Sequence, residues 1–248
     1  TGRVWYCPLE AYEERYTLQL DAWTHGRLVE HGLPVTVIDG LPLASSTPGI
    51  STGVVLDAHA RPYFALAQTM RLIEQLKAER IAPDDVIYLA DLFHPGYEGL
   101  VYALCQQFPD PACRPRIVAH CWAQSVDPYD FTHRMRAWMR HYELLVDQTI
   151  AGIFVASTAL QQLLESALFS APIHVVGLPF DRVEVRFRAP TVLRPLAERT
   201  KRIVFASRFD PEKQPHFWLD LVELAHDEPA LRGYEFAVLT GASLLRST

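Results

Sequence analysis

The chain has 248 residues, of which 49% are hydrophobic and 21% charged, and its formal net charge is −6. This is the composition of a globular protein with one large or two small domains, and the acidic balance argues against a non-specific nucleic-acid binder. The four cysteines form no CxxC pair, so we expect reduced thiols in a cytoplasmic protein. No apolar run is long enough to predict a membrane span.

Short, continuously apolar runs recur along the first 181 residues and are rich in β-branched and aromatic side chains. Strands that are buried on both faces have this pattern, and such strands belong to parallel sheets. The predicted strands are 4–6, 35–38, 86–90, 117–119, 153–156 and 173–176.

Helical patterns separate these runs, at 12–31, 63–80, 97–107, 131–147 and 158–168. In the second helix an apolar stripe predicts the face that packs against the sheet. It consists of Leu66, Met70, Ile73 and Leu76. A similar stripe predicts core positions in the fourth helix, at Met135, Trp138 and Met139. Ser157 or Thr158 would cap the last helix.

The alternation of strands and helices predicts right-handed βαβ units and an α/β fold. Residues 1–181 would form a first Rossmann-like lobe, and the charged, proline-containing segment 182–200 a linker. A new βαβ unit then begins in 201–248, with a strand at 203–206, a helix at 215–225 and a strand at 236–239. Because a complete nucleotide-binding lobe needs on the order of 150 residues, we expect the second lobe to be incomplete in this chain.

Polar residues follow two of the predicted strands directly, at the ends of 86–90 and 117–119. In open α/β sheets, ligands bind outside the carboxyl ends of the strands, which makes these loops candidate sites. Several of these residues also have an ordinary structural explanation: Asp91 and His94 could cap and orient a turn, His120 could be a satisfied core histidine, and Trp122 could serve packing. The candidates are Asp91, His94, His120, Trp122 and Asp127.

Two cations, Arg208 and Lys213, lie in the loop between the predicted strand 203–206 and the helix that follows. A guanidinium grips phosphate oxygens as a fork, a lysine adds a point charge, and a helix N-terminus favours anions. The pair therefore predicts a diphosphate site. Alternatively, both cations are surface residues paired with Asp210 and Glu212.

The segment 202–215 (RIVFASRFDPEKQP) resembles the opening of the C-terminal lobe in retaining GT-B glycosyltransferases of the glycogen-synthase-like clan. Upstream, 116–120 (RIVAH) is similar to the strand of that clan that ends in a histidine. The segments 151–158 (AGIFVAST) and 172–181 (PIHVVGLPFD) resemble two further units in the right order. The resemblance covers roughly residues 80–225.

This resemblance implies an α/β fold of the GT-B type, with two Rossmann-like lobes, and transfer of a sugar from a nucleotide-diphosphate sugar to an acceptor hydroxyl with retention. Arg208 and Lys213 would hold the donor diphosphate, and His120 would lie beside the transferred sugar. Asp91, His94, Trp122 and Asp127 would face the acceptor. The clan implies no metal and no cofactor beyond the donor substrate, because the two cations take the role of a divalent ion.

Three features depart from the clan. The glycine-rich loop after the first strand is absent, since 8–17 reads PLEAYEERYT, and 178–181 (LPFD) lacks the usual Asn-Gly. The carboxylate pair that holds the donor would lie beyond Thr248. The absent glycine-rich loop bears on the donor contact that the first loop makes in the clan. The acceptor stays open among a carbohydrate, a small molecule and modified DNA.

Two alternative functions remain. The first is a phage-type glycosyltransferase acting on hydroxymethylated DNA bases, for which a cluster of arginines at 134, 136 and 140 could supply phosphate contacts. The second is a non-catalytic GT-B-like binding or scaffold subunit. A Rossmann-type dehydrogenase is disfavoured because no glycine fingerprint follows any strand.

Overall fold

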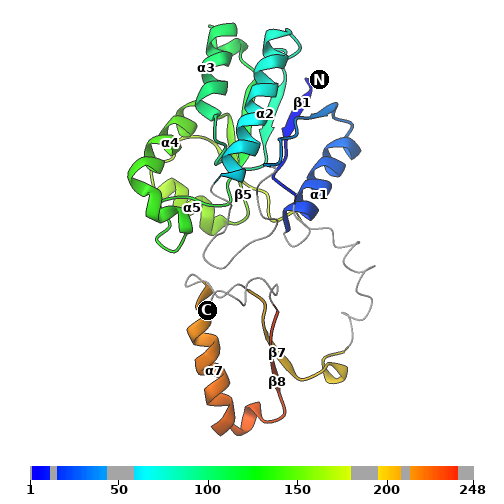
Figure 1. The fold of residues 1–248 in the computed structure, drawn as a ribbon, viewed down its shortest axis with the longest axis vertical. Coiled ribbons are helices and arrows are strands. Elements are labelled where there is room, and N and C mark those ends of the chain that lie inside the picture. The colour runs from blue at the N-terminus through cyan, green and yellow to red at the C-terminus, as the bar shows by residue number, and fades with distance from the viewer. Residues whose placement is uncertain (1, 12–15, 44–58, 180–194, 208–212, 240–248) are drawn as a thin grey trace. The chain divides into compact units, whose positions relative to one another are not determined.

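A computed structural model describes residues 2–11, 16–43, 59–179, 195–207 and 213–239 (Figure 1). The chain divides into two compact units. The first contains the described residues up to 179, and the second contains those from 195 onward. None of the described helices is long and apolar enough to cross a membrane.

The first unit is built on a six-stranded sheet in the order β2-β1-β3-β4-β5-β6. Every neighbouring pair is parallel, which confirms the predicted α/β class with a Rossmann-like sheet. The strands are β1 (Val4–Cys7), β2 (Val35–Val37), β3 (Val86–Leu89), β4 (Arg116–His120), β5 (Gly152–Val155) and β6 (Ile173–Val175). All six predicted runs form strands, with ends that differ by at most one residue.

Helices cover the two faces of this sheet unequally (Figure 1). One buried cluster joins α2, α3, α4 and α5 to side chains such as Trp5 and Leu89, whereas a smaller cluster joins α1 to Val4 and Tyr6. The helices are α1 (Tyr16–Glu30), α2 (Ala60–Lys77), α3 (Tyr97–Gln107), α4 (Arg136–Thr149) and α5 (Thr158–Ser166), and 3₁₀ turns occupy Pro111–Cys113 and Phe131–Met135.

Local chemistry explains two of the helix starts. The Ser157 hydroxyl accepts a hydrogen bond from the backbone N–H of Leu160 at 3.3 Å, which is the expected N-cap. α3 begins after Gly96, whose φ of +91° is costly for other residues. A Cβ at Gly96 would also lie 2.8 Å from the Thr69 hydroxyl, so glycine lets α3 start against α2.

The predicted inward face of α2 is wrong at three of its four positions. Leu66, Met70 and Ile73 are exposed, with Met70 at 64%, and only Leu76 is buried. The helix instead buries Phe64, Ala65, Gln68 and Leu72. The polar side chain of Gln68 can be buried on this face because its amide donates hydrogen bonds to the carbonyls of Pro8 and Ile38.

The stripe predicted in the fourth helix is only partly buried. Met139 is 2% exposed, but Trp138 is 48% exposed and contacts the ring of Phe93 at the surface. The predicted helix 131–147 begins with a 3₁₀ turn, and α4 itself starts at Arg136.

In the second unit, parallel strands β7 (Arg202–Phe205) and β8 (Glu235–Val238) flank α7 (Pro215–Asp227) in sequence. Short 3₁₀ turns lie at Leu196–Glu198 and Pro229–Leu231. The indole of Trp218 is buried between Phe205 and Phe236, with ring centroids 5.8 Å and 5.7 Å away. The described part of this unit therefore has its own small aromatic core.

Candidate functional site

His120 ends β4 at the carboxyl edge of the sheet and is 2% exposed. Burial lowers the pKa of its imidazole to about 4, so the ring is neutral near pH 7. Its Nε2 atom is buried and has no hydrogen-bond partner among the described residues. A neutral imidazole can donate from one nitrogen and accept at the other, so Nε2 is available for a polar group of a ligand.

Trp122 fixes the orientation of this ring. The two aromatic planes are stacked, with centroids 3.8 Å apart and an interplanar angle of 5°. The indole N–H donates to the carbonyl of Ala90 at 2.7 Å, and the N–H of Leu92 donates to the carbonyl of His120 at 2.7 Å. The loops after β3 and β4 are therefore joined, as their positions on neighbouring parallel strands require.

A pocket of about 190 Å³ opens beside His120 on the face of the sheet that α1 covers. Its walls are mainly apolar and aromatic, and typical pockets for complete small-molecule ligands are larger, roughly 300–1,000 Å³. The space suits a single ring better than a whole nucleotide sugar. The sheet contributes Tyr88, His120 and Phe154, α1 contributes Trp23, Thr24, Arg27, Leu28 and His31, and the segment after β6 contributes Val176, Gly177 and Pro179.

Asp91 follows β3 at the same carboxyl edge of the sheet as His120. Its side chain, however, contacts α2, which packs on the face of the sheet opposite to the pocket. Its Oδ1 accepts a hydrogen bond from the N–H of Phe93 at 3.1 Å, and its Oδ2 is 3.5 Å from Nη2 of Arg61. Arg61 also donates to the carbonyl of Phe93 at 3.0 Å. Arg61 was not among the residues predicted from the sequence, because a single arginine at the start of a helix forms no recognisable pattern.

His94 lies inside the fold. Its Nε2 is 3.2 Å from the Thr69 hydroxyl, and burial, together with the positive charge of Arg61, lowers its pKa to about 3. The backbone N–H of His94 donates to the hydroxyl of Tyr142, which in turn donates to the carbonyl of Leu92. His94 thus anchors the loop that carries Asp91.

Asp127 organises a turn. Its Oδ1 accepts a hydrogen bond from the N–H of Tyr129 at 2.9 Å, and its own N–H donates to the carbonyl of Gln124 at 3.3 Å. The turn is fixed to α4 because both the N–H and the hydroxyl of Ser125 donate to the buried carboxylate of Glu143, at 2.7 Å and 2.9 Å.

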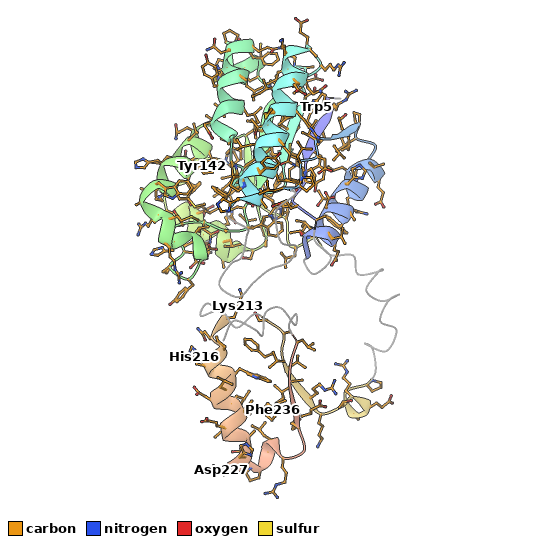
Figure 2. All side chains as sticks on the ribbon, in the orientation of Figure 1. Trp5, Tyr142, Lys213, His216, Asp227 and Phe236 are labelled. Carbon is orange, nitrogen blue, oxygen red and sulfur yellow. The ribbon has the colours of Figure 1, made fainter. Side chains whose placement is uncertain are left out.

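Lys213 is exposed just before the N-terminus of α7 (Figure 2), and Arg208 lies outside the described residues. In the first unit, the structure gathers His120, Trp122 and Asp91 at one edge of the sheet, whereas His94 and Asp127 serve the loops around them. Among the residues described, no cluster of three or more His, Cys, Asp or Glu side chains could hold a metal ion.

Comparison with protein-family models gave no match, and comparison with curated proteins gave none either. The class that the fold defines is an α/β protein with a Rossmann-like parallel sheet.

Proposed function

We propose that the protein is a GT-B glycosyltransferase that moves a sugar from a nucleotide-diphosphate sugar to an acceptor hydroxyl, with retention. The observation that carries this proposal is Nε2 of His120, which is buried at the carboxyl edge of the sheet and has no hydrogen-bond partner within the described part of the chain. A buried polar atom without a partner costs about 1–3 kcal/mol, and a sugar hydroxyl would satisfy it.

The surroundings of His120 support this chemistry. A neutral ring can hydrogen-bond a sugar hydroxyl without adding a charge to the site, and the stack with Trp122 orients the ring in advance. The adjoining pocket has aromatic walls and the size of one ring. A preorganised group of this kind stabilises a transition state without the cost of reorienting it during the reaction.

The other predicted residues have distinct parts in this proposal. Arg208 and Lys213 would neutralise the donor diphosphate as charge develops on the leaving nucleotide, so that no metal is needed. Asp91 and Asp127 would contact the acceptor, and His94 would position the loop of Asp91 through its bond to Thr69. The acceptor is a carbohydrate, a small molecule or modified DNA.

Isothermal titration with UDP, GDP and the corresponding nucleotide sugars tests the donor site. We expect micromolar binding of one nucleotide, weakened roughly 10- to 100-fold by Arg208→Ala or Lys213→Ala, because each loses a charge-assisted contact. Lys201→Ala is the matched control, since Lys201 lies over the ring of Tyr234 in the same unit. Absence of nucleotide binding would instead favour a non-catalytic binding subunit.

A further inference from the structure

Arg61 is a buried cation whose hydrogen bonds are incomplete. Its side chain is 3% exposed, and in the described ranges of the chain only Nη2 has partners: the carbonyl of Phe93 at 3.0 Å and Oδ2 of Asp91 at 3.5 Å. Nε and Nη1 are buried and have no hydrogen-bond partner among the residues that the structure describes.

This arrangement is unfavourable without a further ligand. A guanidinium stays protonated in proteins and carries five N–H donors, so it cannot relieve burial by losing its charge. Each buried donor left unpaired costs about 1–3 kcal/mol. The long contact with Asp91 compensates the charge only in part, because a buried ion pair needs close geometry and complete hydrogen bonding.

The position of Arg61 is where this type of sheet binds ligands. β1 and β3 are neighbours, yet α1 after β1 packs on one face of the sheet and α2, which precedes β3, packs on the other. The crevice outside the carboxyl ends of two such strands is the usual ligand site of open α/β sheets. Arg61 is in the first turn of α2, reaches the loop after β3, and adds its charge to the positive end of the helix dipole.

We propose that Arg61 binds an oxyanion, the phosphate or carboxylate group of a small-molecule ligand, at the switch point between β1 and β3. An oxyanion would accept hydrogen bonds from the N–H groups of Nε and Nη1 and would also neutralise the positive charge of the guanidinium. Water would supply only the hydrogen bonds. Asp91 engages Nη2 and leaves the other two nitrogens for the ligand. The inference goes beyond glycosyl transfer and does not depend on it.

Nuclear magnetic resonance of the arginine Nε–H groups tests the site in the intact chain. The Arg61 signal is assigned by its loss in Arg61→Lys. We expect titration with inorganic phosphate, with acetate, or with both to shift this signal saturably, and the effective probe identifies the oxyanion class. If neither probe shifts it, the proposal is overturned.

Titration calorimetry with the effective probe provides the second measurement. Arg61→Met should weaken binding at least about 10-fold, and Arg61→Lys should fall between it and the wild type, because lysine keeps the charge but loses the planar donors. Arg71→Met, on the same helix, should bind like the wild type. Equal binding by Arg61→Lys and Arg71→Met would contradict the site even if Arg61→Met fails to fold. Nucleotide binding by Lys213→Ala is measured separately, so the two proposals fail independently.

Discussion

The imidazole of His120 lies flat on the indole of Trp122, 3.8 Å away and within 5° of parallel. The indole of Trp122 is itself held, since it donates its N–H to the carbonyl of Ala90, the residue directly after the neighbouring strand β3. The direction of Nε2 is thus fixed by the backbone of two strands, as the precise placement of a functional group requires.

His120→Asn should lower kcat/KM for glycosyl transfer by roughly 100-fold or more, because the positioned ring nitrogen is lost. Trp122→Phe should cause a smaller loss, since it keeps an aromatic partner but removes the bond to Ala90. The exposed His174 on edge strand β6 provides the control, and His174→Asn should retain activity. Equal losses in the two histidine variants would argue against a specific role for His120.

Stability should fall as the pH drops below about 7. Burial holds the folded-state pKa of His120 near 4 and that of His94 near 3, below the unfolded value of about 6.5. The unfolded chain therefore takes up protons first, and each histidine should remove about 2 kcal/mol of stability by about pH 5. Urea unfolding at several pH values measures the slope, which His94→Gln should flatten. An unchanged slope in that variant would contradict a buried neutral His94.

Asp85→Asn should destabilise the first unit by about 2–3 kcal/mol. The carboxylate accepts hydrogen bonds from the indole N–H of Trp5 at 2.8 Å and from the backbone N–H groups of Arg3 and Ala82. Burial acts to raise its pKa, but these bonds outweigh it and lower the pKa, so this stability should be lost only as the pH falls below about 4. Asp84→Asn, at the exposed neighbour, should be neutral in the same denaturation experiment.

Trp218→Ala should unfold the second unit while leaving the first intact. The indole is 7% exposed and supplies the contact between Phe205 and Phe236, and removing a core tryptophan typically costs about 3–5 kcal/mol. Limited proteolysis should then cut selectively after residue 195. Leu219→Ala, at a position 53% exposed, should leave the pattern unchanged. Cleavage spread over both units would show that their stabilities are coupled.

The two faces of α2 should respond oppositely to substitution. Leu72→Ala should cost about 2–5 kcal/mol because Leu72 is completely buried, whereas Met70→Lys should change stability by less than about 0.5 kcal/mol. Chemical denaturation compares them directly. A large cost for Met70→Lys would indicate that this exposed stripe is covered by another surface.

The sequence by itself determined the strands of the first unit and their parallel pairing. Runs such as 86–90 and 153–156 are continuously apolar because both faces of each strand are buried. This apolar character can be recognised from the residues of the run alone. The helix 97–107 was likewise predicted with its final bounds. The histidine at the end of the fourth strand was identified because ligand sites follow the ends of parallel strands.

Only the tertiary structure decided which side chains are buried and which groups they contact. The burial of Gln68 in place of Met70 depends on carbonyls from Pro8 and Ile38, which lie 60 and 30 residues away in the chain. The stacked His120–Trp122 pair depends on the carbonyl of Ala90, the residue after β3. The incomplete hydrogen bonding of Arg61 depends on the loop that contains Asp91 and Phe93. The spacing of apolar residues describes hydrophobicity along one helix or strand. The burial and hydrogen bonding of its side chains are set by distant segments of the chain that pack against that element.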